Sequence, residues 1–227
     1  MKRSEINNAI KFAEELLSKH NITLPFFANL PPKKEEFNIP SRENLKKTML
    51  GWDVSDFGSG DFKKCGAVLF TVRNGLVNDS SVGTPYAEKY IILKDGNEQE
   101  IPMHYHISKT EDIINRAGGL LCIQVYAKGE DGAPDPGAPV TLYRDGERYE
   151  AKAGEILNIT TGNSLTLPPF VYHRFFVKTG SGDTVIGEVS KINDDNIDNI
   201  FANDSGNRFC EVIEDEPIYR LLVNEYN

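Results

Sequence analysis

The chain has 227 residues, of which 39% are hydrophobic and 26% are charged, a composition typical of globular proteins. Its 34 acidic and 25 basic residues leave a formal net charge of -9. Nucleic acid and anionic membrane surfaces would repel such a chain, so we expect neither as a partner. No apolar run approaches the roughly 20 residues that span a bilayer, and polar residues interrupt the N-terminal segment where a signal peptide needs an apolar core. The three cysteines are widely spaced, so we expect free thiols and a cytoplasmic location.

The first 50 residues predict a helical and extended arm. Ser4 is placed to cap a helix whose apolar residues, from Ile6 to Leu17, recur every three or four positions. Four prolines between residues 24 and 40 predict extended chain, and Ser41 is placed to cap a short second helix. We expect residues 1–50 to pack as an arm on a β-barrel domain, residues 51–227, so that the whole chain forms a single structural unit.

The character of the sequence changes after residue 51. Residues 52–62, WDVSDFGSGDF, predict a loop rich in glycine and aspartate. Short β-type runs then recur, with turn residues between them, and Asp95-Gly96 and Asp145-Gly146 are strong hairpin signals. Such a series predicts a mainly β fold, an antiparallel sandwich or barrel. The last 14 residues predict a short helix or an edge strand.

One short segment, residues 101–119, carries two histidines and an acid. His104 and His106 are two positions apart, so on a strand their side chains point the same way. Glu111 follows after a four-residue bend that can return its carboxylate to the same place, and His173 lies on a second β-type run downstream. Imidazoles and a carboxylate that converge in this way can bind a divalent metal. The alternative is that the histidines are ordinary polar residues on a strand.

The spacing of these residues resembles the first motif of the cupin superfamily, G-x5-H-x-H-x3,4-E-x6-G. Every element from His104 onward is present, including Glu111 and Gly118. Glu98 stands where the leading glycine is expected.

The second cupin motif, G-x5-P-x-G-x2-H-x3-N, is also matched in part. Gly162, Pro168 and His173 have the expected spacing, whereas Phe170 replaces the central glycine and Val177 replaces the asparagine. The resemblance implies a small cupin-type antiparallel β-barrel, jelly-roll-like, with an N-terminal helical extension. It also implies one metal ion per chain, held by His104, His106, Glu111 and His173.

A longer pattern narrows the resemblance. H-x-H-x2-K-x-E-D-I-I-N-x-x-G-G, together with residues 50–62 and 187–201, resembles the D-lyxose isomerase family of cupin sugar isomerases over nearly the whole chain. This resemblance implies a ketol-isomerase that converts D-lyxose to D-xylulose and also acts on D-mannose and D-fructose. Because cupins host many functions, an iron-dependent dioxygenase and a non-catalytic sugar-binding cupin remain as alternatives.

The implied reaction assigns roles to further residues. A metal with two open positions can bind two sugar oxygens and stabilise an enediolate. We expect Mn²⁺, with Fe²⁺, Zn²⁺, Co²⁺ and Ni²⁺ as alternatives. Glu188 is our candidate for the general base that carries a proton from C2 to C1, although it is equally placed to be a solvent-facing strand acid. Lys109 is our candidate for neutralising an oxyanion or orienting a hydroxyl, and the alternative is an ordinary solvated lysine. A hydride shift between C1 and C2 is a second mechanism.

Three residues are candidates for sugar binding. Gln124 lies on the strand that leaves the first motif, and Asp198 lies in an acid-rich stretch that can close over the site. Trp52, the single tryptophan, either stacks on the sugar or packs the loop against the barrel. We also expect a homodimer, since cupins commonly pair through barrel edges and N-terminal arms.

Overall fold

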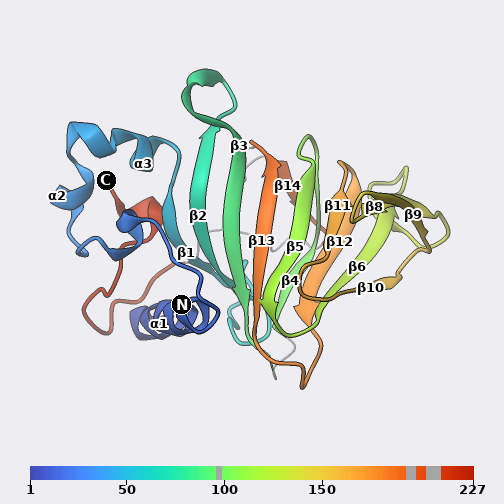
Figure 1. Cartoon of the computed structure of the whole chain (residues 1–227), viewed down its shortest axis with the longest axis horizontal. Coiled ribbons are helices and arrows are strands. Elements are labelled where there is room, and N and C mark those ends of the chain that lie inside the picture. Colours follow the sequence, from blue (N-terminus) through green and yellow to red (C-terminus); the bar gives the residue numbers. More distant parts are fainter. Residues whose placement is uncertain (96–98, 193–197, 203–210) are drawn as a thin grey trace.

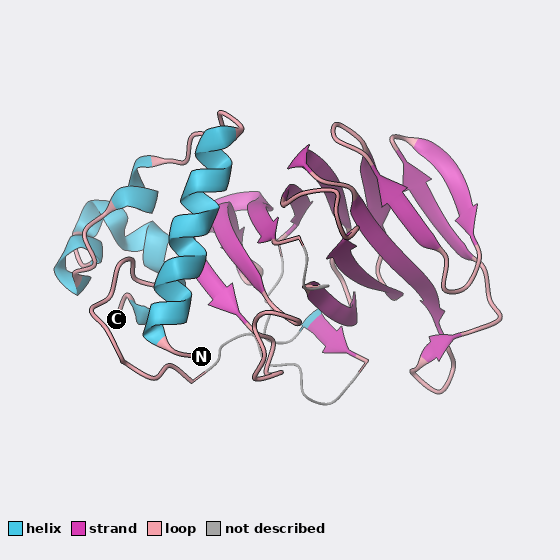
Figure 2. Ribbon diagram, turned by 90° about the horizontal axis from the view of Figure 1, so that it is seen from below, coloured by secondary structure: helices cyan, strands magenta, loops and turns pink. Residues whose placement is uncertain are grey.

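The structure, a computed structural model, describes residues 1–95, 99–192, 198–202 and 211–227 (Figure 1). Its strands form two antiparallel sheets, and its helices gather at one end of the larger sheet, near both chain termini (Figure 1, Figure 2). In spatial order, the larger sheet contains β1 (Gly51–Ser55), β2 (Ala67–Leu76), β3 (Asp79–Leu93), β13 (Thr184–Lys191), β5 (Glu111–Gly118), β11 (Ser164–Leu167), β8 (Val140–Arg144) and β9 (Glu147–Ala151). The smaller sheet contains β10 (Ile156–Ile159), β6 (Leu121–Lys128), β12 (Val171–Val177), β4 (Glu100–His106) and β14 (Asn199–Phe201), with β7 (Pro134–Asp135) paired to β6.

Helix α1 (Arg3–Lys19) packs its apolar face on β1 and β2. It begins one residue before the predicted cap, because the C-terminal segment binds its first turn. The Arg3 amide donates to the Ile213 carbonyl at 2.8 Å, and the Ser4 hydroxyl donates to Asp215 at 2.7 Å. Of the helices that the structure describes, none has the length and apolar character that a membrane span requires.

The proline-rich segment is less extended than predicted. It contains two short helical turns, η1 (Phe26–Asn29) and α2 (Lys34–Phe37). Buried aromatic side chains explain them: Phe27 stacks on Phe70, and Phe37 stacks on Tyr226 with ring centroids 4.0 Å apart. Ser41 lies within η2 (Pro40–Arg42) and does not cap the next helix, α3 (Glu43–Lys47). The C-terminal tail contains a single short turn, η3 (Val223–Glu225).

Residues 52–55 were predicted as the start of a loop, and this prediction was wrong because they form β1. Trp52 pairs with Phe70 and Val54 pairs with Val68, and all four side chains are buried under α1. The gain from burying these side chains outweighs the turn-forming preference of the neighbouring aspartates and glycines. The turn region begins at Asp56.

The hairpin predicted at Asp145-Gly146 is confirmed. It joins β8 to β9, and both turn residues have positive φ angles, 50° and 86°, as a two-residue hairpin turn requires. Of the second predicted hairpin only Asp95 is described, since Gly96 lies outside the described residues, as does Glu98. Cys65 and Cys122 are free thiols as expected, and Cys210 lies outside the described residues.

The two sheets face each other across an apolar core. Ile91 and Ile113 from the larger sheet meet Ile123 and Phe175 from the smaller one, and each is at most 2% exposed. A separate core lies between the opposite face of β1 to β3 and the helices. The predicted mainly β fold with an N-terminal helix is therefore confirmed. One end of the space between the sheets holds charged groups instead of apolar ones, and these form the candidate site.

Candidate active site

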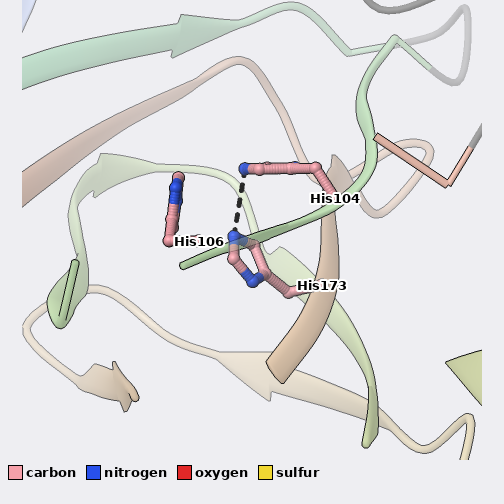
Figure 3. Close-up of side chains that lie close together, drawn as sticks. All are labelled: His104, His106 and His173. Atoms are coloured by element: carbon pink, nitrogen blue, oxygen red, sulfur yellow. Dashed lines mark hydrogen bonds between the residues drawn. The ribbon is translucent and has the colours of Figure 1, made fainter. Parts of the chain in front are cut away.

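Three histidines from the smaller sheet converge in the space between the sheets (Figure 3). His104 and His106 lie on the same face of β4, and His173 on β12 is the direct cross-strand partner of His104. Their ligating atoms all lie within 4.8 Å of one another, and no ring is more than 5% exposed. The strand pairing alone therefore brings three imidazole nitrogens to one buried point.

The hydrogen bonds of two rings determine which nitrogen carries the proton. Nδ1 of His104 lies 2.8 Å from the Pro102 carbonyl oxygen, and Nδ1 of His173 lies 2.9 Å from that of Val171. Since a carbonyl only accepts, both Nδ1 atoms are donors, and in a neutral ring this leaves the lone pair on Nε2. These two Nε2 atoms are only 3.1 Å apart, joined by the dashed line in Figure 3. Two lone pairs at that distance are stabilised by a cation between them.

Glu111, at the start of β5, brings a carboxylate to the same point. Its Oε1 lies 3.0 Å from Nε2 of His173 and 3.4 Å from Nε2 of His106. This oxygen and both ring nitrogens of His106 are buried without a hydrogen-bond partner. Buried polar atoms are rarely left unsatisfied. Three imidazoles and one carboxylate therefore fit a divalent metal ion, which would satisfy them.

Burial and neighbouring charges shift the pKa values of three side chains in the cluster. Burial lowers the pKa of His104 well below 6.5, and neighbouring His173 and His106 lower it further. Burial and the nearby Lys109 ammonium lower the pKa of His106. For Glu111, burial favours a higher pKa, but Lys109 and His106 together hold its pKa well below 4.5. At neutral pH the rings of His104 and His106 are thus neutral and Glu111 is ionised, the forms that metal binding requires.

Glu188 lies beside this cluster on β13. Its Oε1 accepts a hydrogen bond from Lys109 at 3.1 Å and from the Ser190 hydroxyl at 2.9 Å, and it lies 3.4 Å from the Lys89 ammonium. Lys109 also contacts Glu111 at 2.8 Å, so one ammonium group joins the two carboxylates. With its side chain only 5% exposed, Glu188 is not a solvent-facing strand acid.

These groups surround a cavity of about 50 Å³. Its polar lining consists of Lys89, His104, His106, Lys109, Glu111, Glu188 and Asn199. The volume suffices for an ion and a water molecule. It is well below the roughly 300 Å³ of a small-molecule site, so a sugar must displace lining side chains or reach the ligands from the rim.

Asp198 lies behind the histidines and does not line this cavity. Its Oδ1 accepts hydrogen bonds from the amide of Ser108 at 2.8 Å and from its hydroxyl at 2.7 Å. Its Oδ2 lies 3.8 Å from Nδ1 of His106. The carboxylate is therefore directed at the back of the His106 ring, and it does not close over the cavity as we expected.

The other two sugar-binding candidates are not brought to the cavity. Gln124 is the cross-strand partner of Arg174, the neighbour of His173, so it lies on the opposite face of the smaller sheet, where its Oε1 accepts from Arg174 Nε at 2.7 Å. Trp52 lies in the core beneath the helices, where its indole donates to the Ala28 carbonyl at 3.0 Å. Of the two roles considered for Trp52, the structure places it in the packing role.

Lys89 is a site residue that the sequence reasoning missed. It lies on β3 opposite Glu188, is only 4% exposed and lines the cavity. The sequence contains a sign that Lys89 is buried. Ala87, Ile91 and Leu93 lie on the same face of the strand as Lys89, and their apolar character predicts that this face is buried. A lysine on a buried face needs a charge partner. Glu188 is that partner.

The chain is similar to D-lyxose isomerases over nearly its whole length. The model of a family described as D-lyxose isomerase matches residues 1–226. The D-lyxose/D-mannose isomerase of Escherichia coli O157:H7 is 38% identical over 227 residues, which cover 100% of this chain and 98% of that protein. The D-lyxose/D-mannose isomerase of Serratia proteamaculans is also 38% identical, over 228 residues, with the same coverage of both chains.

Solved structures share the fold at much lower identity. A mutant L-ribose isomerase of Acinetobacter sp. DL28 in complex with L-ribose aligns with a TM-score of 0.61 and 14% identity, covering 94% of this chain and 98% of that chain. The L-ribose isomerase of Cellulomonas parahominis with L-ribose aligns with a TM-score of 0.56 and 14% identity, covering 91% and 94%. These matches confirm the predicted cupin-type architecture.

Proposed function

Because the chain belongs to the D-lyxose isomerase family, we propose that it interconverts D-lyxose and D-xylulose, and also D-mannose and D-fructose. D-Mannose has the same configuration at C2, C3 and C4 as D-lyxose, so one site can accept both aldoses. The observation that carries the proposal is the buried cluster of His104, His106, His173 and Glu111. The Glu188 carboxylate lines the same cavity as His104, His106 and Glu111.

The four clustered side chains would hold one divalent ion, with Mn²⁺ as our first choice because the set includes a hard carboxylate oxygen. Fe²⁺, Zn²⁺, Co²⁺ and Ni²⁺ also bind such mixed sites. When bound, the ion supplies a Lewis acid for the two sugar oxygens, worth several kcal/mol of charge stabilisation.

Glu188 would act as the general base. One carboxylate can take the proton from C2 and return it to C1, since the two carbons are adjacent in the open-chain sugar. Lys109 and Ser190 hold Oε1 of Glu188 in place, and Lys109 also contacts Glu111. The same ammonium group therefore fixes the position of the base relative to the ligand cluster and places a positive charge beside the reacting oxygens.

An assay of an aldose panel tests the proposed reaction. The purified protein is treated with chelator and then supplied with Mn²⁺, and ketose formation is measured at each stage. We expect turnover of D-lyxose and D-mannose that disappears with chelation and returns with Mn²⁺. A protein that binds Mn²⁺ stoichiometrically but converts neither aldose would exclude the proposal. Oxygen consumption, followed with an electrode, would instead support the dioxygenase alternative.

Isotope incorporation tests the route of the hydrogen. In deuterated water, the base mechanism places solvent deuterium in the product, because the proton on Glu188 exchanges between the two transfers. Product with no deuterium at all would favour the hydride shift and remove the base role from Glu188.

The ligand set has its own test. We expect His173→Ala to lose both bound Mn²⁺ and turnover, because the ring supplies one of the clustered nitrogens. His20→Ala is the control, since His20 lies at the end of α1 outside the cluster. Retention of one Mn²⁺ per chain by His173→Ala would remove His173 from the set.

We also propose a homodimer, as expected from the cupin resemblance. The arm leaves apolar surface, with Phe26 64% and Ile39 38% exposed, while neighbouring Phe27 anchors it to its own chain. Light scattering after gel filtration is expected to give twice the 25.4 kDa chain mass. A species of 25.4 kDa at all concentrations tested would contradict this.

A further inference from the structure

His106 differs from the other two clustered histidines because its Nδ1 faces a carboxylate and not a backbone carbonyl. Nδ1 of His104 and Nδ1 of His173 each bond the carbonyl two residues earlier, at 2.8 and 2.9 Å. Nδ1 of His106 has no hydrogen-bond partner, and 3.8 Å away lies Oδ2 of Asp198. At the third ring a carboxylate oxygen thus faces Nδ1, at a longer distance than the carbonyl oxygens at the other two rings.

Asp198 is held where it is by the turn that follows His106. Its Oδ1 accepts from the amide and the hydroxyl of Ser108, and its carbonyl accepts from the Ile107 amide at 3.1 Å. The residue is 5% exposed, and Oδ2 is buried without a hydrogen-bond partner. An unsatisfied acceptor and an unsatisfied nitrogen therefore face each other inside the protein, and both are costly to leave unpaired.

We infer that Asp198 is the positioning residue of His106: the negative charge of its Oδ2, 3.8 Å from Nδ1, favours the tautomer with the proton on Nδ1, so that Nε2 of His106 carries the lone pair on the side of Glu111. On that side, Nε2 lies 3.4 Å from Oε1 of Glu111. A carboxylate behind a ligating imidazole fixes its tautomer and ring orientation and makes the ring a stronger donor. The inference rests on the proposed function, because it concerns the same metal site.

Substituting asparagine for Asp198 separates this role from a purely structural one. Asp198→Asn keeps the shape of the side chain, and its oxygen can still accept from Ser108. It then presents an NH₂ group to Nδ1 of His106, which favours the tautomer with the proton on Nε2, the wrong side for a metal. The Ser108→Ala variant is the control, since it weakens the attachment of Oδ1 and leaves Oδ2 facing His106.

Two measurements test the inference without using catalysis. Competition with a chelating indicator gives the affinity for Mn²⁺, and we expect Asp198→Asn to bind roughly 10- to 100-fold more weakly, with Ser108→Ala close to the unmodified protein. Thermal unfolding of the metal-free variants checks that each is folded. Long-range ¹H–¹⁵N NMR of the metal-free, unmodified protein reads the tautomer of His106 directly and needs no variant.

The outcomes separate this inference from the proposed function. A proton on Nδ1 of His106 together with weakened Mn²⁺ binding by Asp198→Asn supports the positioning role. A proton on Nε2, or an Asp198→Asn affinity equal to that of the unmodified protein, overturns it while leaving the metal site in place. Failure of the unmodified protein to bind Mn²⁺, with His106 protonated on Nδ1, overturns the proposed metal site instead.

Discussion

At the residue scale, Glu188 is the side chain on which turnover should depend most directly. Replacing it with glutamine keeps its size but removes the proton acceptor, so we expect Glu188→Gln to lower kcat by roughly 10²- to 10⁴-fold. Bound Mn²⁺ should remain, since Glu188 is not in the ligand cluster. Steady-state kinetics with metal analysis checks both statements.

Ser190→Ala is the matched control for Glu188→Gln. It removes one of the donors to Oε1 of Glu188, at 2.9 Å, but leaves the carboxylate and Lys109 in place. Its loss of kcat should be much smaller. If Glu188→Gln lost no more activity than Ser190→Ala, the base would have to be another residue.

Phe170, which departs from the cupin motif, has a strained backbone conformation. It stands where the motif has glycine, and its φ angle is 62°, in the left-handed region that glycine adopts without strain. The ring is 48% exposed, so it recovers little of that cost by burial. We expect Phe170→Gly to be more stable than Phe170→Ala by about 0.5–1 kcal/mol, because both lose the ring but only glycine relieves the backbone. Urea unfolding measures the difference, and the reverse order of stability would show that the backbone is not strained.

At the element scale, strand pairing assembles the histidine cluster. β12 lies between β4 and β6, and its register places His173 opposite both His104 and Val125. A shift of one residue would turn His173 to the outer face, where Arg174 and Gln124 now lie. The pairing of three strands therefore determines the site as much as the histidines do.

Two glycines of the cupin motifs have almost the same φ angle but differ in the space around them, so they allow a matched test of close backbone packing. Gly118, at the end of β5, and Gly162, before β11, have φ angles of 94° and 93°. A β-carbon at Gly118 would lie 2.0 Å from the Asp183 carbonyl oxygen, whereas one at Gly162 would meet nothing within 4 Å. Gly118→Ala should therefore cost roughly 2 kcal/mol more stability than Gly162→Ala. Equal losses in urea unfolding would mean that the segment carrying Asp183 moves away without cost.

At the scale of the whole molecule, ion pairs and hydrogen bonds connect the N-terminal helix to the C-terminal segment. The fully buried Arg3 guanidinium pairs with Glu214 at 2.6 Å and also with Glu225, and Ser4 bonds Asp215. The hydrogen bond from Arg3 holds the pKa of Glu214 below its ordinary 4.5, and Ser4 holds the pKa of Asp215 below its ordinary 3.8. As pH falls, Glu214 and Asp215 therefore take up protons at a higher pH in the unfolded chain than in the folded protein.

This stabilisation is fully present above the ordinary pKa values and is lost as pH falls through the lower values of the folded protein. We expect Tm to decline below about pH 5, and Arg3→Met to remove part of that decline because Glu214 then titrates normally. Arg148→Met is the control, since Arg148 and its partner Glu150 are 65% and 59% exposed. Calorimetry from neutral to acidic pH measures the curves. Parallel Tm curves for Arg3→Met and the control would exclude this account.

The sequence by itself determined those features that follow from local spacing. The two-residue separation of His104 and His106 puts them on one face of any strand, and the Asp145-Gly146 pair specifies its own turn. The mainly β fold followed from the period of the apolar residues. These features need only neighbouring residues, so the chain encodes them directly.

Only the tertiary structure decided which side chains from distant strands share one space. Gln124 and His173 are on paired strands but face opposite sides, and Asp198 reaches the back of His106, not the cavity. Lys89 meets Glu188 because β3 and β13, which are far apart in the chain, are neighbours in the sheet. Strand order and register set these contacts, and they depend on the packing of the whole core, which no short stretch of sequence contains.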